Sequence, residues 1–421
     1  MNNSVNNESK AELYKKPNQL SVLYYLVKRH FKVFWKNHTL VLFSLMVPLV
    51  VLVVYVIFLR PMEVSQLDAA IKEGLGFEFD PENATKEALE LVHKIRGIAD
   101  EWMIAGVLSV SCITVALNTE NVMVTDKEMG ITKDFASSPI SGSTVTVSYA
   151  VFNAVVTFLV NFIVYLICLI YLAAYGAILP DFIDGCAIVG VMLLSTISAT
   201  LLVHFICSFV NSVSVLSSVT AIFSAAIGFL CGAYLPASMM PRYVQYLTMF
   251  FPGSYSSGLF RNYFMRKPLT ELYQTLIDAS NSGSGLITKS EQEISAFIKG
   301  VEGDFSLELD FFGHKVPVSI MALVVLAFIA IFIILDLFFT PQAFKKYFSR
   351  KSKLAKRLNK KNKDFVSTPE LPDELVTDNS DKTRSEVNDD VKNVPANKDN
   401  FPFDGDEKNI SSSGHIIDKD E

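Results

Sequence analysis

The sequence lacks the short motifs by which enzymes bind nucleotides or build common catalytic sites. It contains no G-x-x-x-x-G-K-[ST] phosphate-binding loop, no H-E-x-x-H and no G-x-S-x-G. Those absences exclude nucleotide binding, metallopeptidase chemistry and hydrolase chemistry by these routes. The six histidines are scattered and no cysteines are paired at the spacing of metal ligands, so we expect no metal site. We therefore expect no covalent chemistry from this chain.

Cysteine is scarce, and its positions argue against a disulfide framework. All five cysteines lie within long apolar runs, where packing as small apolar residues accounts for them. They are Cys112, Cys168, Cys186, Cys207 and Cys231. The bases near the C-terminus have little aromatic interleaving, so we also expect no nucleic-acid partner.

Long apolar runs are what the chain has in abundance. Half of its 421 residues are hydrophobic, and its mean hydropathy is positive although residues 364–421 are strongly polar. Six runs reach about 17 residues or more, the length that a helix needs to cross a hydrocarbon core of about 30 Å. We therefore predict an all-α membrane protein, because in lipid only a helix satisfies these backbones internally. The predicted spans are 39–59, 102–118, 147–176, 185–210, 214–235 and 318–340.

Lysine and arginine concentrate at the two ends of this membrane domain, residues 39–340. The arm 1–38 carries seven of them, and the segment 341–363 carries ten without a single acid. Both termini should therefore be cytoplasmic, which places 60–101 and 236–317 outside. The loop 119–146 is then the only substantial cytoplasmic loop between spans. Residues 364–421 hold 16 acids against 6 bases and should form a disordered tail.

Residues 19–36 have the pattern of a helix that lies on the membrane surface. Apolar side chains recur at helical spacing on one face, and four basic residues gather on another. A helix of this kind lies in the headgroup layer, where anionic lipid attracts its bases, or is an ordinary juxtamembrane anchor. The apolar residues are Leu20, Leu23, Tyr24, Val27, Phe31, Phe34 and Trp35, and the bases are Lys28, Arg29, Lys32 and Lys36.

Ionisable residues are rare within the predicted spans. His204 lies in the fourth span, and Asp336 lies about one turn from the inner end of the sixth. His204 is either a residue of a transport pathway or a hydrogen-bonded packing residue. A proton-coupled carrier usually needs more such groups, so their scarcity counts against one.

The fifth span carries two stripes of small residues. Such stripes let helices approach closely in lipid, either within one subunit, at a subunit interface or along a substrate path. One stripe is Ser217, Ala221 and Ala225, and the other is Ser224, Gly228 and Gly232.

The polar stretch TDKEMGITKDFASSPIS, residues 125–141, interrupts the apolar runs. It carries five charges, and Gly130 and Pro139 favour a short helix bounded by turns. A soluble energy source has to touch a membrane transporter on its inner face, and no other loop there is large enough.

Two segments of the chain resemble the permeases of ABC-2-type transporters over about residues 16–345. The stretch DKEMGITKDFASSPIS is similar to the family's E-x-G-T…SP(V/I)S motif, although Ile131 stands where Thr is usual. A second segment, GAYLPASMMPRYVQYLTMFFPGSYSSGLFRNYFM, resembles the family's G-x-x-x-P…MP…P…R pattern. The matching residues are Glu128, Gly130, Pro139 and Ser141 in the first, and Gly232, Pro236, Met240, Pro241, Pro252 and Arg261 in the second.

This resemblance implies a role for the loop. In the family, the loop between the second and third spans docks onto a separate ATP-binding subunit, which holds ATP and Mg, so no cofactor is expected in this chain. Two permease protomers and two such subunits make the transporter. By the resemblance, Asp126, Glu128 and Lys133 dock the ATPase, while Gly130 and Pro139 shape the loop. The segment after the fifth span, with Pro252 and Arg261, should form short re-entrant external helices.

The expected function is therefore export across a bacterial cytoplasmic membrane. A mostly apolar lining suits a lipophilic or amphipathic substrate such as a drug, an antibiotic peptide or a lipid-linked molecule. One alternative is a self-sufficient ion-coupled carrier or channel, and another is a membrane-anchored scaffold whose acidic tail is the working part. The sequence leaves open whether the protomers form a homodimer or a heterodimer.

Overall fold

The computed structural model describes residues 18–77, 85–138, 140–235, 239–282, 287–307, 309–311 and 314–340. Several predictions from the sequence fall on residues outside this part of the chain. They concern residues 1–17 of the N-terminal arm, Pro139, Pro236, the basic segment 341–363 and the acidic tail 364–421.

Within the described part of the chain, six helices are long and apolar enough to cross a membrane. They confirm the predicted all-α architecture and a multi-pass membrane protein. The six are His38–Leu75, Lys86–Glu128, Gly142–Tyr175, Phe182–Ser208, Val213–Leu230 and Val318–Thr340.

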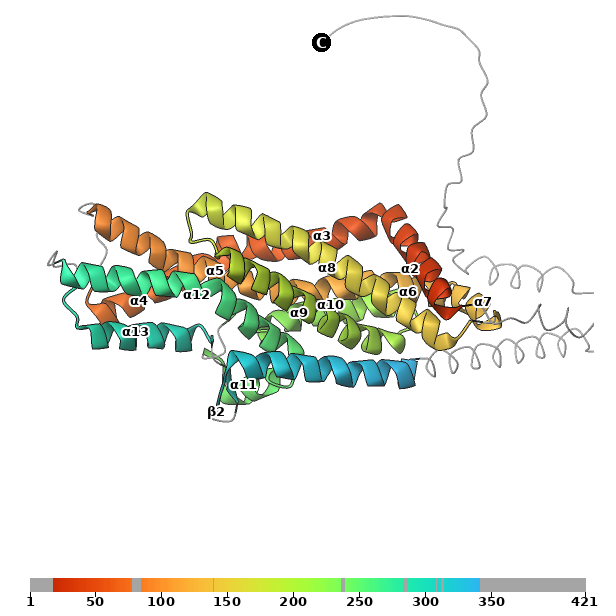
Figure 1. Cartoon of the computed structure of the whole chain (residues 1–421). Coiled ribbons are helices and arrows are strands. Elements are labelled where there is room, and N and C mark those ends of the chain that lie inside the picture. Colours follow the sequence, from red (N-terminus) through yellow and green to blue (C-terminus); the bar gives the residue numbers. More distant parts are fainter. Residues whose placement is uncertain are drawn as a thin grey trace, which may run out of the picture. The chain divides into compact units, whose positions relative to one another are not determined.

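Two of these spans consist of more than one helical element. The first joins α3 (His38–Val54) through the π-helical turn η1 (Tyr55–Leu59) to α4 (Arg60–Leu75). The second joins α5 (Lys86–Thr119) to α6 (Asn121–Glu128). The next three are α8 (Gly142–Tyr175), α9 (Phe182–Ser208) and α10 (Val213–Leu230), and the sixth is the helix Val318–Thr340, blue in Figure 1.

The first two spans extend well beyond their predicted boundaries. At 1.5 Å per residue, the 43 residues of Lys86–Glu128 measure about 65 Å, twice the thickness of a hydrocarbon core. The first span continues as α4 until Gly76, whose φ of 69° ends the helix. The segment 60–101 is therefore largely a continuation of the first two spans. The predicted boundaries mark where apolar residues end, and the helices continue with polar ones.

Helix α5 forms the centre of the bundle, and α3, α8, α9 and α12 (Pro252–Asn281) pack around it (Figure 1). Its residues from Ile98 to Leu117 are buried on every side. Small residues allow this close packing. A Cβ atom at Gly106 would lie 2.9 Å from the Cβ atom of Ala233, so only glycine fits there.

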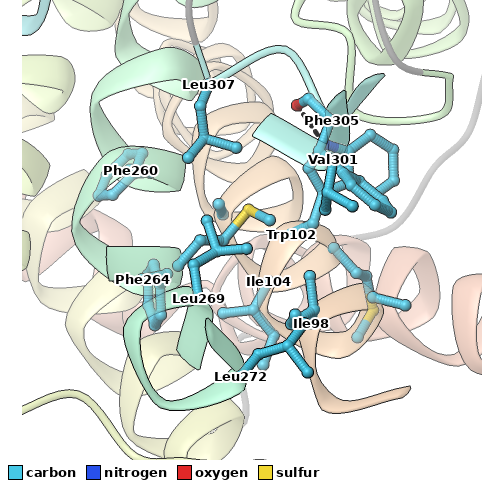
Figure 2. Packing of buried hydrophobic residues seen from close by; sticks show 14 of the residues in the cluster. Ile98, Trp102, Ile104, Phe260, Phe264, Leu269, Leu272, Val301, Phe305 and Leu307 are labelled. Atoms are coloured by element: carbon cyan, nitrogen blue, oxygen red, sulfur yellow. Dashed lines mark hydrogen bonds between the residues drawn. The ribbon is translucent and has the colours of Figure 1, made fainter. Parts of the chain in front are cut away.

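The described residues of the segment 236–317 form a lobe with the ends of α4 and α5. It contains α11 (Arg242–Thr248), α12, α13 (Glu291–Asp304) and an antiparallel hairpin of β1 (Leu309–Phe311) and β2 (His314–Val316). Figure 2 shows how Trp102 of α5 joins this core, because its indole Nε1–H donates to the carbonyl of Phe305 at 3.0 Å. In Figure 1, α4 and α13 lie at the end of the bundle opposite α2 (Gln19–Lys36), α6 and α7 (Ile131–Ser137).

The prediction of short helices after the fifth span is only partly right. Helix α11 has seven residues, but α12 has 30, and its residues 252–261 are all buried. Pro252, predicted to belong to these short helices, is the first residue of the long α12, where its missing N–H costs nothing.

Candidate functional site

The predicted cytoplasmic loop consists of two short helices, α6 and α7, that meet at Gly130. Gly130 has a φ of 83°, a left-handed conformation that other residues adopt only at a cost. This conformation turns the chain between α6 and α7, and α7 is the short helix that Gly130 and Pro139 predict. Both helices lie at the same end of the bundle as α2 (Figure 1).

Asp126 of α6 is buried and joins α6 to two other helices. Its carboxylate accepts hydrogen bonds from Arg29 of α2 at 2.6 and 3.0 Å, in the bidentate geometry of a strong ion pair. The hydroxyl of Tyr149 in α8 donates to the same carboxylate at 2.6 Å. The hydrogen bond from Arg29 to Asp126 raises the pKa of the Arg29 guanidinium. The sequence analysis places Asp126 among the residues that couple the chain to the ATPase, and the structure places its carboxylate inside the protein rather than on the surface.

The face of α2 that packs on the bundle differs from the predicted apolar face. Leu26, His30 and Phe34 are its buried residues, one helical turn apart, and they lie against α8. His30 stacks on the Tyr149 ring with centroids 4.0 Å apart, and its Nε2 lies 3.0 Å from the Ser148 hydroxyl. Burial and the neighbouring Arg29 lower the pKa of His30 to about 3, so the ring is neutral.

The predicted lipid-facing residues of α2 are divided between partial burial and exposure. Leu23, Val27 and Phe31 are half-buried beside the packed face, and Phe34 is fully buried. The exposed apolar side chains of α2 are Leu20, Tyr24, Tyr25, Val33 and Trp35. Arg29, assigned to the headgroup layer from the sequence, instead pairs with Asp126.

Lys127 of α6 caps the end of α9. Its ammonium is buried and donates to the carbonyls of Cys207, Ser208 and Val210 at 3.1, 2.9 and 3.3 Å. The last carbonyls of a helix have no partner within the helix, and a cation there also suits the helix dipole. The charge of Lys127 thus holds α9 against α6.

Glu128 of α6 binds the start of α10. Its Oε2 accepts from the backbone N–H of Val213 at 2.9 Å, one of the N–H groups that a helix start leaves without an internal partner. Asp126 therefore connects α6 to α2 and α8, Lys127 connects it to α9, and Glu128 connects it to α10. We call these three residues the 126–128 triplet.

Beyond the 126–128 triplet, the chain presents an exposed surface. Met129 has 65 % of its surface accessible although it is apolar. Lys133, Asp134 and Ser137 of α7 are also exposed. Lys133, predicted as a docking charge, is therefore exposed, and so is Met129, which the sequence analysis missed and which lies four positions before it.

The two small-residue stripes of α10 have different surroundings. Ser217 and Ala221 are exposed and Ser224 is half-buried. Gly228 instead makes room for Tyr234, because a Cβ atom there would lie 2.0 Å from the Tyr234 ring. Gly232 has a φ of 65° and belongs to the turn that ends the helix. The GFLCG stretch therefore accommodates the chain's own return at Tyr234.

Arg261 of α12 is buried and holds this turn. Its guanidinium donates to the carbonyl of Gly232 at 2.5 Å and lies 5.0 Å from the centroid of the Trp102 ring. The arginine of the second motif thus ties α12 to the turn after α10 and to α5, and the hydrogen bond and the cation–π contact stabilise that junction.

Ionisable residues do gather in the bundle, which the sequence analysis did not expect. His204 Nδ1 lies 3.0 Å from Oε1 of Glu120, and both side chains are buried. The amide of Asn153 donates to the same oxygen at 2.8 Å. Asp336 and His204 line one pocket. From the sequence Glu120 belongs to the loop, because it lies beyond the apolar run, but α5 and α6 keep it inside the bundle.

Among the described residues, no three His, Cys, Asp or Glu side chains are grouped so that they could hold a metal ion.

Comparison with models of known protein families matches residues 21–265 to the ABC-2 type transporter family. The match covers more than half of the chain, from α2 into α12, and includes the 126–128 triplet. No curated protein matches the chain.

Proposed function

This chain belongs to the ABC-2 type transporter family, and we propose that a separate ATP-binding subunit drives it to export an amphipathic substrate. It is a membrane-spanning permease subunit of an ABC transporter. Family membership implies association with an ABC ATP-binding subunit, which would bind the ATP and Mg. The observation that carries the proposal is the 126–128 triplet, which links the exposed α7 to four helices of the bundle.

The proposed docking surface comprises Met129, Lys133, Asp134 and Ser137. It combines an exposed apolar side chain with charges of both signs, as the core and rim of a protein interface require. We place it on the cytoplasmic side, because the arm that precedes the first span is rich in lysine and arginine.

Movement of α7 would reach the spans through three contacts. Closure of the ATP-binding subunits would displace α7 and α6 together, since only Met129 and Gly130 lie between them and the backbone hydrogen bonds from Gly130 to Lys127 and from Lys133 to Gly130 brace the turn. Asp126 would carry the displacement to α2 and α8, Lys127 to α9, and Glu128 to α10. The spans would then move as rigid helices between inward-open and outward-open states, which ATP and substrate stabilise differently.

Two features support an assembly of two permease protomers in a cytoplasmic membrane. The stripe formed by Ser217 and Ala221 on α10 is exposed and small, which suits close approach of a second helix in lipid. The exposed aromatic residues of α2 suit the interfacial layer of a bilayer. The substrate is lipophilic or amphipathic in this proposal, in keeping with the apolar composition of the spans.

Co-purification from the native cells tests the proposal. The wild-type chain should bring down an ATP-binding subunit, and a Met129→Asp, Lys133→Glu variant should not. A matched control is Phe182→Asp, an exposed apolar residue at the start of α9, which should retain the subunit. Absence of any ATP-binding subunit with the wild type, in conditions that preserve other ABC complexes, would contradict the proposal.

A second candidate function is ion-coupled transport without an ATPase. The gathering of Glu120, His204 and Asp336 favours it, because proton-coupled carriers use ionisable residues inside the membrane. Proteoliposomes that contain the permease alone decide between the two. Substrate uptake driven by a pH gradient without ATP would favour the carrier, and uptake only with ATP and the ATP-binding subunit would favour the permease.

A further inference from the structure

A pocket of about 430 Å³ lies between α8, α9 and the helix Val318–Thr340. Each helix lines it with residues three and four positions apart, and so with one of its faces. Much of the face that α8 contributes is small, because Ser143, Thr146, Ala150 and Ala154 follow one another along it. These short side chains leave the space that the pocket occupies.

The walls present only apolar atoms to the pocket, although some of the lining residues are polar. The hydroxyl of Thr146 donates to a carbonyl of its own helix at 3.0 Å, and His204 pairs with Glu120 inside the bundle. Asp336 accepts a hydrogen bond from Thr340 at 3.1 Å. A cavity without accessible polar groups offers water no partner and stays dry. The pocket therefore suits an apolar occupant, and any polar head group has to remain outside it.

The pocket opens sideways, toward the surface that lipid covers. Val151 of α8 and Ile333 and Leu337 of the last helix line it and are 39, 41 and 47 % exposed. Apolar material from the bilayer can therefore enter without crossing water. Lipid chains are as apolar as these walls, so the gain on filling the pocket is the dispersion contact that an empty space lacks.

The dimensions of the pocket match one acyl chain. Its wall on α8 runs from Ser143 to Ala154, a rise of about 16 Å at 1.5 Å per residue. This is about half of a hydrocarbon core of about 30 Å, and so about one leaflet. At the roughly 30 Å³ of a water molecule, which is about the size of a methylene group, the volume holds about fourteen such groups. The pocket begins at the end of the bundle where α7 lies, because Ser143 is the second residue of α8 (Figure 1).

The last helix makes few close contacts with the rest of the chain. Only Met321, Val325, Asp336 and Thr340 of its residues are buried. Along its inner part, the face that carries Ile333 and Leu337 meets the pocket where a neighbouring helix would otherwise pack. An occupant of the pocket would therefore complete the packing of this helix against α8.

We propose that one acyl chain of a bilayer phospholipid occupies this pocket, in the leaflet on the side of α7. The chain lies between α8 and the last helix, and its head group stays at the membrane surface beside the start of α8. The site requires only this chain and a bilayer, so it goes beyond the proposed function and does not depend on it.

Photolabelling of the purified protein in phosphatidylcholine vesicles tests the proposal. The vesicles contain a trace of phosphatidylcholine with a diazirine in the middle of one acyl chain, and peptide mass spectrometry locates the adducts. Leu201 of α9 lines the pocket and is half-buried, so it should be labelled. Exposed Leu159 of α8 should be labelled by the surrounding lipid, and Val203, which is buried and does not line the pocket, should not. Label at Leu159 but none at Leu201 would overturn the proposal.

A variant that fills the pocket separates its occupant from the surrounding lipid. Ala150→Phe adds bulk inside the pocket and should abolish labelling of Leu201 while Leu159 stays labelled. The matched control is Val155→Phe, which adds bulk on an exposed side of α8 outside the pocket and should leave Leu201 labelled. Unchanged labelling of Leu201 in Ala150→Phe would overturn the proposal. Should Ala150→Phe fail to fold, as judged by its melting temperature, Ala154→Met fills the same space with a flexible side chain.

A water-soluble diazirine reagent distinguishes a lipid site from a hydrated cleft. It should label neither Leu201 nor Leu159, and labelling of Leu201 by this reagent would overturn the proposal. The outcome is also distinguishable from failure of the proposed function. If an ATP-binding subunit co-purifies but the lipid does not label Leu201, the lipid site fails alone. If Leu201 is labelled as expected but no ATP-binding subunit is found, the exporter fails alone.

Discussion

The ion pair between Arg29 and Asp126 should control how firmly α2 is held on the bundle. The change Asp126→Asn keeps the size of the side chain and removes its charge. The amide can accept from only one oxygen, so it loses one of the two bonds from Arg29 at 2.6 and 3.0 Å and weakens the other. The bond from Tyr149 at 2.6 Å also becomes an ordinary neutral one.

The magnitude follows from the burial of the two partners. Removing one partner of a fully buried pair costs about 3–5 kcal/mol, and an exposed pair is worth about 0–1 kcal/mol. Here the Asp126 side chain is 4 % exposed and the Arg29 side chain 30 % exposed, so water can partly replace the lost partner. We therefore expect a loss of about 2–3 kcal/mol, a factor of about 30–150 in the equilibrium between bound and detached α2.

Hydrogen exchange of the α2 amides, measured in nanodiscs, reports this equilibrium directly. Exchange in α2 should accelerate by about that factor in Asp126→Asn, while the amides of α12 should be unaffected. The matched control is Asp181→Asn, which breaks the exposed pair with Lys267 and should change little. The double exchange Arg29→Asp, Asp126→Arg should restore much of the protection. Unchanged protection of α2 in Asp126→Asn would refute the assignment of this ion pair as the attachment of α2.

Three further predictions concern residues beside this ion pair. Lys127→Met leaves the carbonyls at the end of α9 without their donor and should lower the free energy of unfolding by about 1–3 kcal/mol. The melting temperature of this variant should therefore fall below that of the control Lys133→Met, which changes an exposed lysine. Equal melting temperatures for the two variants would contradict this prediction. Glu128→Gln keeps an oxygen that can accept from the backbone N–H at the start of α10. Glu128→Lys removes this acceptor at a cost of about 0.5–2 kcal/mol. Only the lysine variant should therefore show faster proteolysis between α9 and α10. Because the pKa of His30 is lowered from 6.5 to about 3, its unfolded form binds more protons between these values. The stability that neutral His30 contributes is therefore complete above about pH 6.5 and is lost as the pH falls toward 3. His30→Gln should remove this pH dependence from the rate of hydrogen exchange in α2. The same pH dependence in the wild type and in the variant would count against the prediction.

The number and the type of the spans could be predicted from the sequence because they depend on local properties. Length and apolarity alone decide whether a segment can cross a bilayer as a helix. The ends of the helices could not be predicted in the same way. Beyond residue 59 the chain becomes polar yet remains helical as α4, since charged residues are good helix formers when they face water.

The lobe around α12 and α13 was not predictable because its packing is non-local. Trp102 and Phe305 are more than 200 positions apart, and their hydrogen bond depends on the return of the whole intervening chain. Pro252 and Arg261 were identified by resemblance, but their contacts with α5 and with the turn at Gly232 follow only from the packed structure.

The turn at Gly130 could be predicted from the sequence. The partners and the burial of the charged residues 126–128 could not. In a helix, successive residues point about 100° apart, so Asp126, Lys127 and Glu128 face three directions. Which of them is buried depends on partners such as Arg29, 97 positions away, and Cys207, 80 positions away. A signal was nevertheless present, because charges so close to an apolar run need partners when they are buried.

The central claim is that the surface around α7 meets an ATP-binding subunit. A photoreactive benzoylphenylalanine placed at Met129 tests it most directly, because this side chain is exposed and follows the 126–128 triplet. On illumination in native membranes, it should form a covalent adduct with an ATP-binding subunit, and the same group at Phe182 should not. Adducts at Phe182 but none at Met129, or none with any ATP-binding protein from either position, would contradict the account.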